Sequence, residues 1–216
     1  MTQPDFESIH MGGWIFDCRR CPSPCDSRSK LHYPFEEDLG RSAVFEKELI
    51  ELINAREGFY AELSSHTAWP DITVFQKQNK EVALFIELKY QQRTFMKVEK
   101  RLPGSGLVPS ETVALNTSDL LRYHQLTNEL RAPVFIFWAI ENRPCIIAAG
   151  EHRFFYASLK KLIRIYRAEK STRSFNRRPG KGDIQQGEHK GVTHNFHFRL
   201  SELKPFNISN DRSFGI

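Results

Sequence analysis

Three charged residues interrupt two short apolar segments of the chain, and their chemical types suit metal-dependent hydrolysis. Asp71 begins the segment DITVF, and Glu87 and Lys89 lie at the end of VALFIELK. Carboxylate oxygens are the ligands that magnesium and manganese prefer, and an ammonium group stabilises negative charge that develops on a phosphate. A metal ion, a water molecule and an ammonium group together suit phosphodiester hydrolysis, so these three residues are the first candidates for an active site.

The two segments that carry these residues have the composition and alternation of β-strands. We expect strands at Asp71–Phe75 and Val82–Leu88, joined by a polar turn into a hairpin. Successive side chains of a strand point to opposite faces of the sheet, so Glu87 and Lys89 share one face. Lys89 is therefore close enough to orient or deprotonate a water bound to a metal, or to stabilise charge on a phosphate.

The register of this hairpin determines whether the two carboxylates meet. A hairpin that is symmetric about Asn79 predicts three cross-strand pairs: Val74 with Leu84, Ile72 with Ile86, and Asp71 with Glu87. Opposed carboxylates with β-carbons about 5 Å apart repel each other and destabilise a hairpin, and a divalent cation offsets that repulsion. The register therefore predicts a magnesium or manganese site, although a β-bulge would shift the pairing.

The remaining pattern predicts an α/β fold in which a mixed central β-sheet is flanked by helices. Apolar periodicity and turn residues indicate these further elements: a helix at Ser42–Arg56, a strand at Phe59–Leu63, a helix at Ser118–Leu130, a strand at Val134–Ile140, a helix at Tyr156–Glu169 and a short strand at Asn195–Leu200. The expected order over the first two thirds of the chain is therefore a helix, a three-stranded meander, a helix and a strand.

The dipeptide PD at residues 70–71, followed by ELK at residues 87–89 on the next strand, resembles the motif of the PD-(D/E)XK, or restriction-endonuclease-like, nuclease superfamily. The resemblance covers about residues 42–140, and the core of that superfamily is similar to the order of elements expected above. The motif is short, and its position on two apolar hairpin strands after a glutamate-bearing helix adds to the resemblance.

The resemblance implies magnesium-dependent hydrolysis of DNA, with Asp71 and Glu87 as metal ligands and Lys89 as the catalytic lysine. Restriction enzymes, branched-DNA resolvases and repair nucleases share this core, and RNA is not excluded as a substrate. Many such enzymes are dimers, so the resemblance also implies a homodimer. One alternative is a non-catalytic DNA-binding or assembly protein on the same fold, although the presence of all three charged residues favours the nuclease.

Two further residues are candidates because of the same resemblance. A glutamate of the first helix often completes the site, and Glu46 is our choice because it lies nearest the apolar stripe of that helix; Glu48 and Glu51 are the alternatives. A solvent-exposed position explains Glu46 equally well. A glutamine or tyrosine of the second helix lies beside the site in some members, and Gln125 is a candidate for this place.

A cluster of cysteines near the start of the chain suggests a second metal site. Cys18, Cys21 and Cys25 lie in CRRCPSPC, and His32 follows them. Zinc binds four nitrogen or sulfur ligands at such short spacings, and an iron–sulfur cluster would use all four cysteines, including Cys145. Reduced thiols without a metal are the favoured interpretation, and a metal-bearing interaction protein is the third functional hypothesis.

Composition and charge limit the remaining possibilities. The chain has 216 residues, 40% hydrophobic residues, a net charge of +5 and a pI near 9.0, which indicate a folded protein that suits a polyanionic partner. We expect a Cys-containing arm at residues 1–39 and a nuclease-like domain at residues 40–216. No secretory signal and no apolar run of about 20 residues are visible, so a soluble intracellular protein without a membrane segment is expected.

A basic segment follows the last predicted helix. Residues 170–191 are polar, basic and glycine-containing, and we expect them to form a loop. Four of its cations are candidates for contacts with nucleic-acid phosphates, with a solvated loop as the alternative: Arg173, Arg177, Arg178 and Lys181.

Overall fold

A computed structural model describes residues 35–92, 94–141, 143, 146–147, 151–176, 184–185, 188–189 and 194–206. Its helices are α2 (Phe35–Asn54), α3 (Val98–Arg101), η3 (Pro109–Glu111), α4 (Thr117–Leu130), α5 (Leu159–Arg173) and η5 (Leu200–Glu202). Its strands are β1 (Phe59–Leu63), β2 (Ile72–Gln76), β3 (Val82–Gln91), β4 (Thr112–Asn116), β5 (Val134–Glu141), β6 (His152–Ser158), β7 (Ser174–Asn176), β8 (Ile184–Gln185), β9 (Glu188–His189), β10 (His194–Arg199) and β11 (Lys204–Pro205). No described helix is long and apolar enough to cross a membrane.

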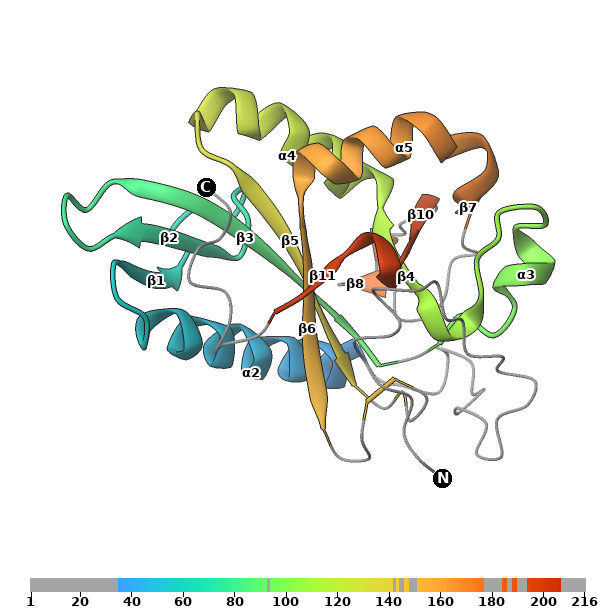
Figure 1. Cartoon of the computed structure of the whole chain (residues 1–216), viewed down its shortest axis with the longest axis horizontal. Coiled ribbons are helices and arrows are strands. Elements are labelled where there is room, and N and C mark those ends of the chain that lie inside the picture. Colours follow the sequence, from blue (N-terminus) through green and yellow to red (C-terminus); the bar gives the residue numbers. More distant parts are fainter. Residues whose placement is uncertain are drawn as a thin grey trace.

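The centre of the fold is a mixed six-stranded sheet in the order β1-β2-β3-β5-β6-β11, with α2 on one face and α4 and α5 on the other (Figure 1). Strands β3 and β5 are parallel, whereas all other neighbours in this sheet are antiparallel. The expected α/β class and the order of helix, three-stranded meander, helix and strand are therefore confirmed. A smaller sheet, β4-β10-β7, lies beside the main one.

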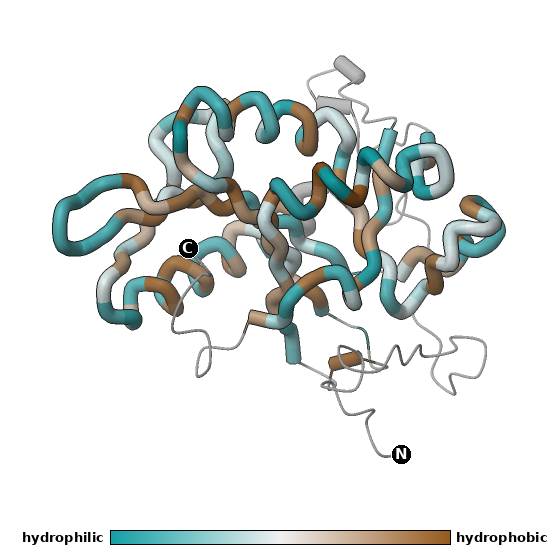
Figure 2. The backbone as a smooth tube through the Cα atoms, turned by 45° about the horizontal axis from the view of Figure 1, so that its top comes forward, coloured by the Kyte–Doolittle hydropathy of each residue, from teal (hydrophilic) through white to brown (hydrophobic). Residues whose placement is uncertain are grey.

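Alternation along β3 divides the apolar core between the two faces of the sheet. Leu84, Ile86 and Leu88 pack in the cluster that α2 covers, whereas Phe85 packs with Trp138 in the cluster beneath α4 and α5. Along the backbone, the β2–β3 hairpin is largely brown near the body of the sheet and teal at its tip (Figure 2). Glu87 and Lys89 alternate with the α2-facing residues, so their side chains point toward α4.

The small sheet positions the start of α4 against β3. Strand β4 ends at Asn116, directly before α4, and side chains of the main sheet hold β4 in place. Trp138 donates a hydrogen bond from Nε1 to the Ala114 carbonyl (3.1 Å), and Gln91 donates from Nε2 to the Thr112 carbonyl (3.1 Å). The N-terminal turns of α4 are therefore held beside the end of β3 where the predicted active-site residues lie.

The predicted hairpin register is confirmed within the ladder of β2 and β3. The observed pairs are Ile72 with Ile86, Thr73 with Phe85, Val74 with Leu84 and, after a bulge, Phe75 with Val82. The ladder begins at Ile72, so Asp71 lies just outside it and is not a cross-strand partner of Glu87 there. The bulge lies at the far end of the hairpin and does not displace the charged residues.

Several predicted boundaries are wrong. The helix expected at Ser42–Arg56 is α2, which begins seven residues earlier, at Phe35, and ends at Asn54, before Gly58 with its φ of +87°. The helix expected at 156–169 is α5, because residues 156–158 complete β6 and the Ser158 hydroxyl caps α5 by accepting from the Lys161 amide. The basic segment expected as a loop begins with the last residues of α5, followed by β7.

Removal of a core side chain from β3 tests this division of the core. Ile86 is fully buried in the α2-facing cluster, so Ile86→Ala leaves a cavity and should lower the free energy of unfolding by about 2–5 kcal/mol. Val82→Ala in the same strand is the matched control, because Val82 is 39% exposed and should cost below about 1 kcal/mol. Urea unfolding monitored by circular dichroism measures both, and equal losses would contradict the assignment of faces.

Candidate active site

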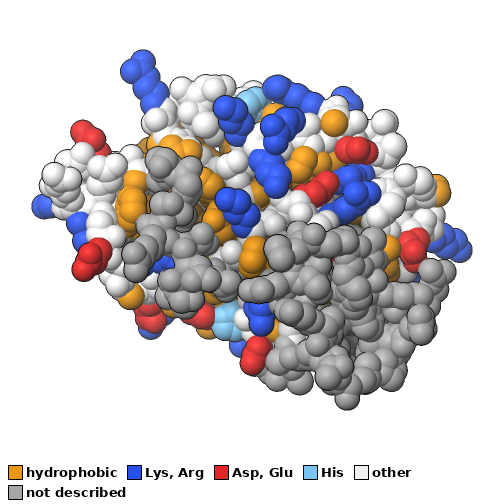
Figure 3. All heavy atoms as spheres, viewed as in Figure 1, with side chains coloured by type: hydrophobic (Ala, Val, Ile, Leu, Met, Phe, Trp, Pro, Cys, Tyr) orange, Lys and Arg blue, Asp and Glu red, His pale blue; other side chains and the backbone are white. Residues whose placement is uncertain are grey.

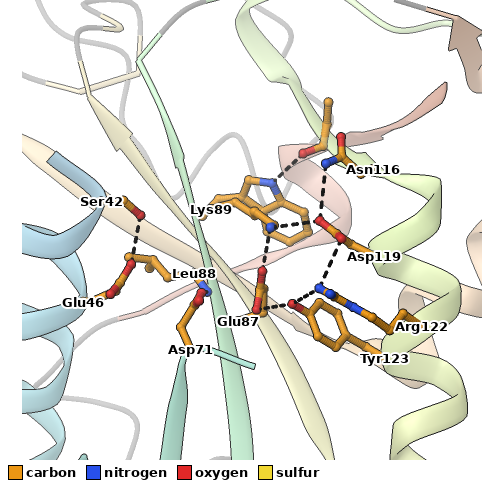
Figure 4. Close-up of polar contacts among 12 residues, drawn as sticks. Ser42, Glu46, Asp71, Glu87, Leu88, Lys89, Asn116, Asp119, Arg122 and Tyr123 are labelled. Carbon is orange, nitrogen blue, oxygen red and sulfur yellow. Dashed lines mark hydrogen bonds and ion pairs between the residues drawn. The ribbon is translucent and has the colours of Figure 1, made fainter. Parts of the chain in front are cut away.

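Glu87 and Lys89 form the centre of a buried charge cluster between β3 and α4 (Figure 4). Glu87 is 4% exposed, and its Oε1 atom lies 2.5 Å from Nζ of Lys89. The Lys89 ammonium also donates to Oδ2 of Asp119, 3.1 Å away on α4. A buried carboxylate is stable only when it is paired and hydrogen-bonded, and these contacts supply both conditions.

Helix α4 completes the cluster with residues that are three and four positions apart. Asp119, Arg122 and Tyr123 lie on one face of the helix because of this spacing. The Tyr123 hydroxyl donates to Oε2 of Glu87 (2.5 Å), and Nη2 of Arg122 donates to that hydroxyl (2.7 Å) and to Oδ1 of Asp119 (3.2 Å). Both oxygens of Glu87 therefore have a partner, one from β3 and one from α4.

Asp71 lies at the end of the β2–β3 ladder, between α2 and the charge cluster (Figure 4). Its Oδ2 atom accepts a hydrogen bond from the backbone amide of Leu88, 2.8 Å away, one residue past Glu87. Glu46 on α2 accepts from the Ser42 hydroxyl (3.1 Å), and its charge acts on Asp71. The structure thus brings Asp71, Glu87 and Lys89 to one place, with Glu46 on the α2 side.

The electrostatic environment of Asp71 is unfavourable for its charged form. Burial and the negative charge of Glu87 raise the pKa of Asp71 to about 7, and Glu46 acts in the same direction. The Leu88 amide and Lys89 only partly offset these effects on the pKa. Asp71 therefore holds a proton over part of the neutral range unless a cation balances the excess of carboxylates.

Lys89 and Tyr123 hold their protons. Burial alone would lower the pKa of Lys89, but Glu87 and Asp119 outweigh burial and raise that pKa above its ordinary value. Burial and the charge of Glu87 raise the pKa of Tyr123. Lys89 is therefore a permanent ammonium group rather than a general base, and Tyr123 is a neutral hydrogen-bond donor.

The carboxylates of Asp71 and Glu87 suit magnesium better than zinc. Among the described residues, no group of three or more His, Cys, Asp or Glu side chains lies close enough together to hold a metal ion. Zinc sites need such a group, whereas magnesium keeps several of its waters and is commonly bound through one or two carboxylates together with substrate phosphates. Asp71 and Glu87, with the raised pKa of Asp71, fit a magnesium ion in this mode.

The residue of α4 that faces the candidate site is Tyr123 and not the predicted Gln125. Gln125 is exposed, and Tyr123 is the residue of α4 that contacts Glu87. The apolar spacing of Leu120, Tyr123 and Leu126 places Tyr123 on the inner side of the helix and Gln125 on the outer side. This spacing is visible in the sequence and could have identified Tyr123, whereas Asp119 gives no such signal.

Arg173 is buried, in contrast to the surface position predicted for it. It is 3% exposed, and its Nη1 atom lies 2.7 Å from Oε1 of Glu202, so it belongs to the interior rather than to a phosphate-binding surface. The other predicted phosphate contacts and the predicted metal-binding cysteines lie outside the described residues: Arg177, Arg178, Lys181, Cys18, Cys21, Cys25, His32 and Cys145.

No protein-family model matches the chain, and no curated protein matches its sequence. Among solved structures, the chain is similar to Hjc, a Holliday junction resolvase from the archaeon Archaeoglobus fulgidus, with 15% sequence identity and a TM-score of 0.38. The similarity covers 75% of this chain and 86% of the resolvase.

The raised pKa of Asp71 predicts a variant that is more stable than the natural protein. Asp71→Asn keeps an acceptor for the Leu88 amide but removes the charge. Because the folded-state pKa of about 7 exceeds the ordinary value of 3.8, ionisation of Asp71 lowers stability as pH rises between these values. Without divalent cations at pH 8, we expect a gain of about 2 kcal/mol, or roughly 4–8 °C in Tm.

Differential scanning calorimetry at pH 8 and pH 4 measures this effect. The gain should vanish at pH 4, where Asp71 is largely protonated in both states. Glu62→Gln, at an exposed position of β1, is the matched control and should leave Tm unchanged within about 1 °C. A loss of stability in Asp71→Asn at pH 8 would show that the charge of Asp71 is already balanced.

Proposed function

We propose that this protein is a magnesium-dependent endonuclease that hydrolyses phosphodiester bonds of DNA. The observation that carries the proposal is the convergence of Asp71, Glu87 and Lys89 at the junction of β2, β3 and α4. The raised pKa of Asp71 supports the proposal, because strongly perturbed carboxylates cluster at binding and catalytic sites.

In this proposal each residue of the convergence has a separate task. Asp71 and Glu87 hold the cation, which when bound supplies a Lewis acid that polarises a phosphoryl oxygen. Lys89 presents a positive charge to the phosphate and stabilises the negative charge that develops during hydrolysis. Glu46 adds negative charge on the α2 side of Asp71 and so favours a cation there, but among the described residues the three carboxylates do not lie close enough together to form one ligand set.

The contacts from α4 make Asp119 and Tyr123 positioning residues. Asp119 holds the Lys89 ammonium from α4, and Tyr123 holds the second oxygen of Glu87. Side chains that orient metal ligands fix the geometry of a site and strengthen its affinity for the metal. The proposed site therefore depends on the docking of α4 as much as on the β2–β3 hairpin.

Two other functions are alternatives to DNA hydrolysis. A DNA-binding or assembly protein would bind DNA without cutting it, and an interaction protein would act through zinc or an iron–sulfur cluster in the cysteine segment. Metal analysis of protein purified without chelators tests the latter. The proposal also includes a homodimer, because the two strands of a duplex need two sites, and light scattering measures this directly.

A cleavage assay tests the proposed activity and its site together. We expect the natural protein to cut at least one of supercoiled, linear and branched DNA in magnesium or manganese. Lys89→Ala and Asp71→Asn should each lower the rate at least about 100-fold, because each removes a charge used in the reaction. Glu62→Gln should cut at the normal rate.

Two results would contradict this expectation in different ways. Absence of cutting with either metal would favour a non-catalytic DNA-binding protein. Cutting that survives both substitutions would place the active site elsewhere. A parallel assay with RNA of the same sequences determines whether the substrate is DNA, and preferential cutting of RNA would reject that part of the proposal.

A second substitution tests the positioning role of Tyr123. Tyr123→Phe removes the donor to Glu87 and should weaken magnesium binding roughly 10-fold or more, as calorimetric titration would measure. The matched control is Tyr60→Phe, because Tyr60 lies on β1 and stacks on Phe75 away from the cluster. A change in Tm without a change in magnesium affinity would assign Tyr123 a structural role only.

A further inference from the structure

A groove with cationic walls lies between α4 and α5, outside the charge cluster described above. Its volume is about 620 Å³. The residues that line it are His124, Thr127, Asn128, Ser158, Leu159, Lys160, Lys161, Ile163, Arg164 and Arg167. The exposed lining is mostly apolar, but four of these ten residues are lysine or arginine and none is acidic, so the charged side chains at the groove suit an anionic ligand.

Among the described residues, no acidic partner is seen for the cations of the groove. Within the described part of the chain, no carboxylate forms an ion pair with Lys160, Lys161 or Arg164. Arg167 donates to Nε2 of His124 across the groove, at 3.2 Å, rather than to an acid. Lysine and arginine side chains gather over α4 and α5 on the face shown in Figure 3. The positive charge of this surface is therefore not neutralised within the described structure.

Two cations of the groove, Lys160 and Lys161, occupy electrostatically unfavourable positions on α5. Lys160 and Lys161 occupy the first turn of the helix, and this turn contains no acidic residue. The N-terminus of a helix carries a partial positive charge, so cations there are repelled while anions are attracted. Acidic residues in the first turn complement the helix dipole and stabilise a helix. The two lysines in the first turn of α5 do the reverse, and this arrangement favours a bound anion.

The spacing of the cations fits several phosphates rather than one. Lys160, Arg164 and Arg167 are separated by four and three residues, so they lie along one face of α5. At 1.5 Å per residue they extend over about 10 Å, and successive phosphates of a duplex strand rise about 3.4 Å each along its axis. Three such rises cover about 10 Å, so the row of cations extends along about four successive phosphates.

Helix α4 connects this groove to the candidate active site. It contributes Tyr123 to the charge cluster and Thr127 to the groove, and the Thr127 hydroxyl donates to the Tyr123 carbonyl at 2.8 Å. One turn of α4 thus separates a residue that touches Glu87 from the wall of the groove. The groove and the charge cluster therefore share helix α4.

We propose that the groove between α4 and α5 binds the phosphate backbone of nucleic acid beside the cleavage position. This inference rests on the proposed nuclease function, and it assigns the backbone contacts to α5 rather than to the segment after Arg173. The contacts are to phosphates, so they add affinity and orientation without sequence preference.

A binding titration in EDTA tests the groove without any cleavage. The probe is a fluorescein-labelled 30-base-pair duplex, and anisotropy gives Kd for the full chain at several NaCl concentrations. The groove variant, Lys160→Ala/Arg164→Ala/Arg167→Ala, changes three exposed side chains and should raise Kd at least tenfold at 100 mM NaCl. The slope of log K against log salt should fall by about 2–3, since each phosphate contact contributes about 0.9.

A matched control separates the groove from net charge. Lys47→Ala/Lys97→Ala/Lys170→Ala also removes three exposed cations, all outside the groove, and should raise Kd less than threefold. Equal weakening in both variants, or none in the groove variant, would overturn the proposal. A groove-dependent rise in Tm with inorganic phosphate, at unchanged duplex affinity, would also overturn it and indicate a small anion. Groove-dependent binding without cleavage would refute the proposed nuclease activity alone.

Discussion

The burial of Glu87 is the constraint on which the rest of the site depends. A glutamate in the middle of an apolar sheet is stable only with partners for both oxygens, and Lys89 and Tyr123 supply them from different elements. Lys89 in turn requires Asp119, which lies on the same helix as Tyr123. One buried carboxylate therefore requires that Tyr123 and Asp119 of α4 face the sheet.

The hairpin shows how much of such a site can be inferred from local pattern. The alternation of β3 identified the face of Glu87 and Lys89, and symmetry about Asn79 gave the correct pairs inside the ladder. Both inferences depend on the two-residue period of a strand, which is a local property. The position of Asp71 was not predictable to the same degree, because its carboxylate ends the ladder through a side-chain hydrogen bond instead of a backbone pair.

The residues that were missed depend on contacts between distant parts of the chain. Asp119 has a role because Trp138 and Gln91 hold β4 and therefore the start of α4, and no local pattern reveals that arrangement. Arg173 looked like a surface cation since its partner, Glu202, lies 29 residues later. Sequence periodicity predicts which face of an element is apolar, but it does not predict which charged residues find partners across the fold.

The parallel pairing of β3 with β5 has a consequence for how the protein folds. More than forty residues separate the two strands, and this segment contains α4. An early β2–β3 hairpin would leave Glu87 in water, because the strand and helix that enclose it arrive only after that long loop closes. The Glu87 carboxylate therefore leaves water late in folding. Substitutions around Glu87 should consequently alter the rate of unfolding more than the rate of folding.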